Sequence, residues 1–553
     1  MCLCSRLRVC SQTHKQPVNH KSFASRRTAL KTGVALTLAA LLPRPGFAQE
    51  TEAPTPPARQ PATVGAPDAP FTFDELAARM QQRAGESYSA PANELPQEIL
   101  DLNYDEHRAI RFRPDHALWR AEPVEFHLQA FYPGWVFKET TKVFVGQNGV
   151  YNRHDFAPSD FEYRPPLDPS KFQDLPLDGV AGFRIHAPIE RPDYFDELVT
   201  FLGASYFRAL GTGTRYGLSA RGLAINTATS ETEEFPRFSA FYIDAPKPGD
   251  SRIRLMAELD SPSLTGAYSF LITPGPQTTI DVTTRLFFRT DVNRVGIAPL
   301  TSMYTFGEND RFGRDDFRPE VHDSDGLCIR RADGEKLWRP LKNPENLAMS
   351  YFQETSPRGF GLLQRDRDFS HYEDIEARYE LRPSLMIEPL GDWGKGTVEL
   401  VEIPTDSEAN DNIVAFWVPE AKAEAGGAME FSYRMHWGLD VEPEDNQAKV
   451  TGTFIGVGGN AADADLSTHR IAINFEGGSI AKLPADAQIE PLIDVPDNTR
   501  LIHSGIARLP NGGWRVALEL EKTDSQPAEL RVKLSMLQRI VSETWLYQWT
   551  NRT

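Results

Sequence analysis

Apolar and polar residues alternate along many short segments of this chain. Between residues 280 and 288, Ile280, Val282, Leu286 and Phe288 stand at every second position together with Thr284, and the same period of two recurs at 241–243, 471–475 and 516–520. Glycine, proline, asparagine and aspartate separate such segments, as in Asn511-Gly512-Gly513. Many short strands with turn residues between them are typical of β-sandwiches and barrels. The pattern therefore predicts an all-β protein.

Two segments favour helix instead. Residues 71–84 place Leu76 and Met80 at helical spacing, and Thr72 stands where a helix N-cap is expected. Residues 194–202 end at a glycine and are a second candidate for a short helix. Helices should thus be few and short.

The first 48 residues have the features of an export signal. Arg26-Arg27 precede an uncharged run at 32–43, and the small residues Gly46 and Ala48 then stand at the two positions that a signal peptidase reads. A paired arginine, a short apolar run and a small-residue cleavage site together indicate a twin-arginine signal peptide. The run is shorter than the roughly 20 apolar residues that a membrane-spanning helix needs. We expect cleavage after Ala48 and no stable membrane anchor in the mature protein.

Composition divides the remaining chain into three parts. Residues 49–70 are rich in proline and alanine and predict a flexible linker. A large domain is predicted over 71–419. The segment between 419 and 428 is polar, small and rich in helix- and strand-breaking residues, and the tail from 428 to 553 has the size of one immunoglobulin-like sandwich.

The net charge and the cysteine content limit the partners and the covalent cross-links that the mature protein can have. Eight of the 59 Lys and Arg residues and none of the 77 Asp and Glu residues precede residue 49, so the mature chain carries 51 basic and 77 acidic side chains, a net charge of −26. Such an acidic protein repels nucleic acid and anionic membranes. Cys328 is the only cysteine after the signal, which excludes an internal disulfide in the mature chain.

The sequence offers carboxylates among aromatic and arginine residues, but no metal or cofactor motif. Ten histidines after residue 48 stand singly, without metal-ligand spacing, and there is no nucleophile elbow or phosphate loop. We therefore expect no metal and no organic cofactor. Aromatic faces and planar charged groups bind sugars, and paired carboxyl groups cleave glycosidic bonds. Spacing alone favours, for each aspartate, a role as a solvated loop residue or turn cap over a catalytic role.

Several strings of residues carry a resemblance to a known family. They are Phe201–Ala209, Tyr216–Ile225, Leu264–Tyr268, Gly296–Met303, Arg339–Leu341, Asp368–Tyr372 and Ser542–Tyr547. On these strings, the chain from about residue 71 to its end resembles the periplasmic glucans biosynthesis proteins of the G/D family. The twin-arginine signal favours the D branch of that family.

The resemblance implies a fold, a compartment and a substrate. The fold would be a large mutarotase-like β-sandwich followed by a smaller immunoglobulin-like β-sandwich. The compartment would be the periplasm, reached through the twin-arginine export machinery. The substrate would be the backbone of β-1,2-glucan, cleaved by an inverting endo-β-1,2-glucanase.

The resemblance also implies site residues. Asp411 matches the general acid of the D branch, and Asp323 matches the general base, with Asp325 as a competitor for that role. Tyr379 and Arg382 fall on positions that contact the substrate, and Glu408 neighbours the acid. For Tyr379 the alternative is ordinary core packing, and for Arg382 a structural ion pair.

Two other functions stay open at this point. The first is a non-catalytic β-glucan-binding protein that guides the nascent chain, since a binder also needs an aromatic- and arginine-lined cleft. The second is an anomer epimerase, which depends on the analogy with mutarotase alone.

The export interpretation is testable at the paired arginines. Replacing both Arg26 and Arg27 with lysine keeps the charge but removes the planar guanidinium groups that a twin-arginine receptor recognises. We expect the double variant to stay in the cytosol, as measured by fractionation and immunoblotting. Efficient export of the double-lysine chain would indicate the general secretory route instead.

Overall fold

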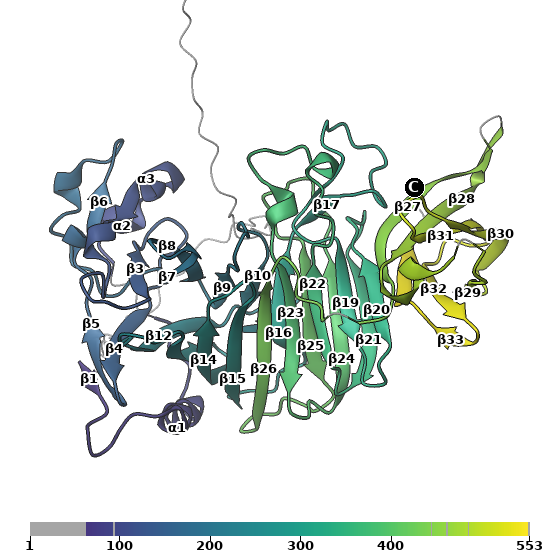
Figure 1. The fold of residues 1–553 in the computed structure, drawn as a ribbon. Helices are drawn as coiled ribbons and strands as arrows, with labels where there is room; N and C mark the ends of the chain where they lie inside the picture. Colours follow the sequence, from purple (N-terminus) through teal and green to yellow (C-terminus); the bar gives the residue numbers. More distant parts are fainter. Residues whose placement is uncertain (1–61, 92–94, 444, 461–462, 485, 551–553) are drawn as a thin grey trace, which may run out of the picture.

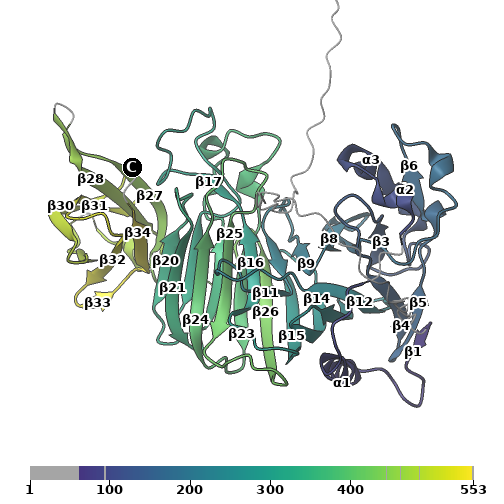
Figure 2. The same cartoon turned by 180° about the vertical axis from the view of Figure 1, so that it is seen from behind.

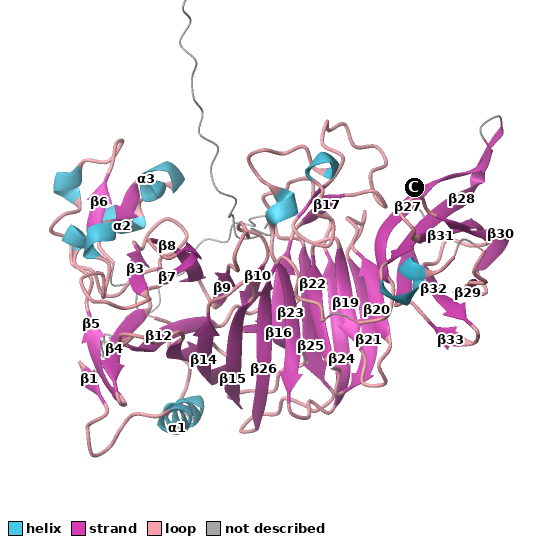
Figure 3. Ribbon diagram, in the orientation of Figure 1, coloured by secondary structure: helices cyan, strands magenta, loops and turns pink. Residues whose placement is uncertain are grey.

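The computed structural model of this protein describes residues 62–91, 95–443, 445–460, 463–484 and 486–550. The predicted signal peptide, 1–48, lies outside these residues, as does most of the predicted linker. Strands predominate in the described ranges (Figure 3), which confirms the prediction of an all-β sandwich protein. No helix in these ranges is long and apolar enough to cross a membrane.

Two large sheets form the body of the molecule (Figure 1). The sixteen-stranded sheet contains, in spatial order, β1 (Thr63–Val64), β5 (Val150–His154), β4 (Lys142–Gln147), β12 (Arg237–Asp244), β13 (Ile253–Asp260), β14 (Leu264–Thr273), β15 (Thr278–Phe288), β26 (Ala428–Gly438), β23 (Ser384–Leu390), β22 (Gly359–Leu363), β19 (Gly326–Arg330), β20 (Lys336–Pro340), β34 (Thr544–Trp549), β32 (Ala528–Met536) and β29 (Glu490–Asp494), with β33 (Arg539–Ile540) paired to β32. The ten-stranded sheet contains β21 (Ala348–Thr355), β24 (Lys395–Glu402), β25 (Ile413–Pro419), β16 (Val295–Ser302), β10 (Ser219–Arg221), β9 (Tyr206–Ala209), β8 (Tyr194–Leu202), β7 (Gly182–Arg191) and β3 (His127–Phe131), with β11 (Leu223–Ile225) paired to β16.

Smaller elements complete the chain. The remaining strands form three small sheets: β2 (Ile110–Phe112) with β6 (Phe161–Tyr163), β17 (Tyr304–Phe306) with β18 (Val321–His322), and the four strands β27 (Lys449–Asn460), β28 (Asp463–Glu476), β31 (Trp514–Lys522) and β30 (Thr499–Arg508). The helices are α1 (Phe73–Ala84), α2 (Gln97–Leu100) and α3 (Tyr104–Arg108), and the 3-10 turns are η1 (Pro114–His116), η2 (Pro158–Asp160), η3 (Pro169–Lys171), η4 (Phe369–His371), η5 (Tyr379–Leu381) and η6 (Gly478–Lys482).

The two large sheets pack through their apolar faces. Along β15, the predicted positions Ile280 and Val282 are buried while their neighbours are only half-buried. Aromatic side chains join the sheets: Phe183 of β7 meets Phe241 of β12 edge to face, with ring centroids 4.8 Å apart. The period of two thus gives one apolar face to each sheet, and the two faces share one core.

A buried ion pair also joins the two sheets. Arg339 of β20 donates from Nη2 to Oε2 of Glu402, at the end of β24, over 3.1 Å. The other oxygen of Glu402 accepts the main-chain N–H of Lys342 at 2.9 Å. Both side chains are almost completely buried, so each charge depends on the other.

The predicted first helix is confirmed. In α1, Leu76 and Met80 are fully buried, and Thr72 is the N-cap of a capping box that Glu75 completes. The helix lies against the outer side of the sixteen-stranded sheet, where Thr265 of β14 donates to the carbonyl oxygen of Met80 at 2.6 Å.

The second predicted helix is wrong: residues 194–202 form strand β8. This strand pairs with β7 and β9 on its two sides. Its second half is buried on both faces, from Leu198 to Phe201, so it lacks the alternation that identifies a half-buried strand. Gly203, the predicted end of the helix, instead follows the last residue of the strand and has a φ of +74°.

Two predicted boundaries differ from the structure: the first strand begins before residue 71, and the chain leaves the large sheets after residue 428. Residues 63–64 form β1, which pairs with β5, so the linker does not extend to residue 70. Residues 428–438 form β26, which pairs with β15 and β23 in the middle of the large sheet. The passage from the large sheets to the following strands therefore comes after Gly438, since the predicted start at 428 falls on a central strand.

Strands β27 to β34 form a smaller sandwich at one end of the molecule, on the left in Figure 2, in which the four-stranded sheet faces the β34, β32 and β29 end of the sixteen-stranded sheet. We call residues 449–549 the C-terminal unit. Its two sheets enclose a second core that includes Ile471, Val516 and Trp545. β34 joins it to the large sheet through only two parallel residue pairs with β20.

The buried pair between the sheets generates a stability prediction. Replacing Glu402 with glutamine leaves Arg339 buried without a countercharge, which costs about 3–5 kcal/mol in comparable pairs. We expect a clearly lower thermal unfolding midpoint by circular dichroism. The control is Glu521→Gln, which breaks the exposed pair with Arg500 and should change stability by no more than about 1 kcal/mol. Equal effects of the two variants would contradict the role given to Arg339–Glu402.

Candidate functional site

The candidate site lies where loops rise from one edge of the large sheets, around β17 in Figure 1. Asp323 follows β18 directly, and its N–H donates to the carbonyl oxygen of Met303 at 2.8 Å. Its carboxylate is buried and lies 3.5 Å from Nε of Arg382. Its Oδ1 accepts no hydrogen bond in the described structure, so the arginine compensates it by charge alone.

Asp411 reaches the same place from a different loop. It precedes Asn412, whose buried side chain is fixed by three main-chain hydrogen bonds. The amide oxygen accepts from the N–H of Tyr304 at 2.8 Å, and the amide nitrogen donates to the carbonyl oxygens of Tyr304 and Ile403 at 3.0 and 2.9 Å. The loops of Asp323 and Asp411 are thus attached to adjacent residues, 303 and 304.

Glu408 and Tyr379 are connected by a hydrogen bond. The hydroxyl of Tyr379 donates to Oε2 of Glu408 at 3.0 Å, and Arg318 donates to the same oxygen at 2.9 Å. Tyr379 is completely buried, and its ring packs with Tyr372. Its ring therefore belongs to a small core beneath the loops and presents no open face to a ligand, while its hydroxyl holds Glu408.

Arg382 links these residues to Asp323. Its guanidinium carbon lies 5.3 Å from the centre of the Tyr379 ring, and its Nε faces Asp323. The structure therefore brings four of the five predicted residues into one chain of contacts, from Asp323 through Arg382 and Tyr379 to Glu408. Asp411, the fifth, is placed by Asn412.

Two residues that sequence reasoning missed, Arg208 and Tyr206, interact with the charge of Asp411. Arg208 is partly buried, is stacked 3.6 Å from the ring centre of Tyr216, and interacts electrostatically with Glu197, Arg382 and Asp411. Burial lowers the pKa of its guanidinium. Burial likewise raises the pKa of Tyr206, and the charge of Asp411 adds to that effect. Arg208 and Tyr206 lie in the string Phe201–Ala209, and Tyr216 begins the string Tyr216–Ile225. Their place in strings that carried the family resemblance was the one signal in the sequence that could have indicated them.

His322, next to Asp323, is a buried cation. Its Nε2 lies 2.8 Å from Glu320 and its Nδ1 lies 2.9 Å from Oε1 of Gln364. Its ring stacks on Tyr304. Burial alone would lower the pKa of His322, but the hydrogen bond and the charge of Glu320 outweigh it and raise the pKa to about 9.

One group in the described residues has the composition of a metal site. Ligand atoms of Glu320, Asp366 and His371 lie within 4.8 Å of one another. Each already has a protein partner, since His371 bonds to Asp366 at 2.5 Å and Glu320 bonds to His322. Sequence spacing could not indicate this group because Glu320 comes from a different loop than Asp366 and His371.

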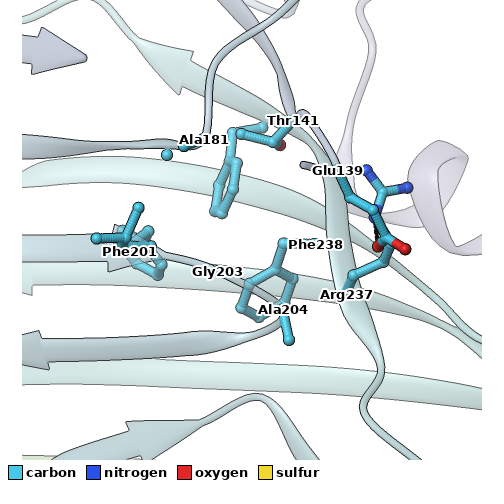
Figure 4. A pocket seen from close by; sticks show the side chains of 11 residues that line it. Glu139, Thr141, Ala181, Phe201, Gly203, Ala204, Arg237 and Phe238 are labelled. Carbon is cyan, nitrogen blue, oxygen red and sulfur yellow. Dashed lines mark ion pairs between the residues drawn. The ribbon is translucent and has the colours of Figure 1, made fainter. Parts of the chain in front are cut away.

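A separate pocket lies between the two large sheets, away from these loops (Figure 4). Phe201, Phe238 and Ala181 line it, and Arg237 and Glu139 form an ion pair of 3.2 Å beside it. The five predicted site residues do not line this pocket.

Comparisons with known proteins agree on one family. A profile described as "Periplasmic glucan biosynthesis protein, MdoG" matches residues 71–549. The chain is 48% identical to glucans biosynthesis protein G of Cereibacter sphaeroides over 525 residues, which cover 94% of this chain and 96% of the relative. It is 43% identical to the protein of the same name from Rhodopseudomonas palustris over 502 residues, covering 90% of this chain and 97% of the relative. The chain belongs to the MdoG family.

Membership places the protein in the periplasm and relates it to glucan biosynthesis. The expected likeness to the D branch is not confirmed, because these relatives carry the name of protein G.

The buried charge of His322 generates a prediction about pH. The folded-state pKa lies above the ordinary value of about 6.5, so its contribution to stability is complete below pH 6.5 and is lost as the pH rises towards 9. We expect the difference in unfolding free energy between the wild type and His322→Gln to shrink between pH 6.5 and pH 9. A difference that stays constant, or grows with pH, would mean that His322 is neutral in the folded protein.

Proposed function

We propose that this protein is an inverting endo-β-1,2-glucanase that shapes the glucan backbone during its biosynthesis. The observation that carries the proposal is the attachment of two carboxylate loops, those of Asp323 and Asp411, to adjacent residues of the chain. Glycoside hydrolysis needs two carboxyl groups on opposite sides of the scissile bond. Family membership supplies the substrate class, and delivery by the twin-arginine route is part of the same proposal.

The surroundings of the two carboxylates support different roles. Asp323 faces the positive charge of Arg382, as suits a base that must be ionised to activate water. Asp411 is partly exposed on its loop, where a leaving-group oxygen could reach it. Glu408 is occupied by Arg318 and Tyr379, so we assign it to holding the acid's loop and not to proton transfer.

Asp325 differs from Asp323 in its environment. It is partly buried, and one of its oxygens accepts the main-chain N–H groups of Arg365 and Asp366 at 2.9 and 3.0 Å. Burial raises the pKa of its carboxyl group. These contacts favour Asp325 as the residue that holds the loop and Asp323 as the base.

A non-catalytic glucan-binding protein is the second candidate. It is favoured by two ion pairs, Asp323 with Arg382 and Glu408 with Arg318. A binding protein would use such carboxylates to orient the arginines towards sugar hydroxyls. The two candidates differ in one result, because only the hydrolase shortens linear β-1,2-glucan.

The acid is tested by Asp411→Asn, which keeps the shape of the side chain but cannot donate the proton. General acid catalysis contributes about 10²–10⁴-fold, so we expect at least a hundredfold loss of glucan cleavage with binding retained. Reducing ends and isothermal titration measure the two quantities. Asp406→Asn, an exposed change on the same loop, is the control and should keep full activity. Near-normal turnover of Asp411→Asn would remove Asp411 from the mechanism, and binding without any wild-type cleavage would favour the binding protein.

The base and the stereochemistry are tested together. If Asp323 activates water on the face opposite the leaving group, the first product is the α-anomer, which NMR detects before mutarotation. Asp323→Asn should lose activity without trapping a covalent sugar, and Asp325→Asn should be milder. A β-anomer would indicate a retaining enzyme, while a larger loss at Asp325 would move the base to that residue.

A further inference from the structure

The side chain of Arg365 joins the loops of the candidate site to the C-terminal unit. It donates to both oxygens of Glu442 at 3.0 and 2.8 Å and to both oxygens of Glu543 at 2.6 and 3.0 Å. A fifth bond goes to the carbonyl oxygen of Val450 at 3.0 Å. Its guanidinium is stacked 3.6 Å from the ring centre of Trp338. All five donors of the guanidinium are used, so its position is completely determined.

The main chain at the same residue holds the loop of the base. The N–H groups of Arg365 and Asp366 donate to Asp325, two residues after Asp323. The side chain of Gln364 donates to the carbonyl oxygens of His322 and Tyr379 at 3.1 and 3.2 Å. Residues on both sides of Asp323 are therefore fixed by the segment 364–366.

A second contact from the C-terminal unit reaches the other end of the loop. The N–H of Thr453 in β27 donates to Oε1 of Glu308 at 3.1 Å. Glu308 stands at the start of the segment between β17 and β18, which leads to Asp323. The hydroxyl of Thr453 is fixed in turn by Nε1 of Trp545 at 3.0 Å. The C-terminal unit thus holds the base loop at two separate points.

We propose that Arg365 is a positioning residue through which Glu543 of the C-terminal unit, together with Glu442 in the segment that leads to this unit, places the base loop, so that the C-terminal unit is a working part of the candidate site. The inference rests on the proposed function, in which Asp323 activates water. It assigns a task to the C-terminal unit that neither its fold nor the family description gives.

Another contact between the same two parts of the molecule provides a matched control. Glu335, between β19 and β20, receives hydrogen bonds from Arg531 and from Thr544, the latter at 2.8 Å. It is a partly buried carboxylate, more exposed than Glu543, and it is likewise paired with an arginine across the interface. Its side chain bonds to Arg331, Arg531 and Thr544, none of which lies in 303–326 or 364–382. A role confined to adhesion would make Glu335 and Glu543 equivalent.

The test compares Glu543→Gln and Arg365→Lys with Glu335→Gln in the full mature chain. Glutamine keeps an acceptor for the neighbouring N–H of Val450, and lysine keeps the charge but cannot bridge two carboxylates. A displacement of about 1 Å at a catalytic group can cost about a hundredfold in rate. We expect kcat on linear β-1,2-glucan to fall about 10- to 100-fold in both test variants, with KM within about twofold, and to stay unchanged in Glu335→Gln.

Hydrogen–deuterium exchange gives a second measurement that does not depend on activity. Peptides covering 318–326 and 364–368 should exchange at least tenfold faster in Glu543→Gln and Arg365→Lys, but not in Glu335→Gln. Unchanged exchange there, or the same loss of kcat in all three variants, would overturn the positioning role. If the wild type does not cleave glucan, the proposed function fails, and the exchange result alone decides whether the C-terminal unit holds the loop.

Discussion

The candidate site depends on the side-chain amide of Asn412. Its hydrogen bonds to the main chain of Tyr304 and Ile403 fix the loop that carries Asp411, while the adjacent carbonyl of Met303 fixes Asp323. An asparagine is suited to this place because it has both a carbonyl oxygen and an amino group, and can therefore satisfy an N–H and two carbonyls at once. The loops of two carboxylates that lie far apart in the chain are thereby attached to the same short stretch of backbone, residues 303–304.

Around this point the structure buries an unusual set of charges. His322 is completely buried, while Asp325, Arg208 and Arg365 are partly buried, and each has partners of opposite charge or main-chain hydrogen bonds. A buried charge is costly unless it is paired, so such networks hold their members in one arrangement. We interpret the network as the support that keeps the loops of the site in position, since the buried apolar cluster beneath these loops is only the small core around Tyr379.

The position of the C-terminal unit gives the molecule a second source of order at the site. Its own core is independent of the large sandwich in most residues, and its sheet connection through β34 and β20 is short. The charged contacts of Arg365 therefore form a large part of what joins it to the loops. Through these contacts the C-terminal unit can fix the position of the loop that carries Asp323, although that loop belongs to another part of the chain.

The sequence by itself determined the strands, the first helix and the general chemistry. The period of two in segments such as 280–288 follows from strand geometry, which is local, and the cap at Thr72 is local too. It misled at 194–202, because a strand buried on both faces has no alternation to read, and at 428–438, because strand pairing over 140 residues leaves no local sign. Only the tertiary structure decided that Asp323, Arg382 and Tyr379 touch, that Tyr379 is buried, and that Arg208 and Arg365 belong to the site. The physical reason is that each of these facts depends on contacts between residues distant in the chain, which no local pattern of polarity encodes.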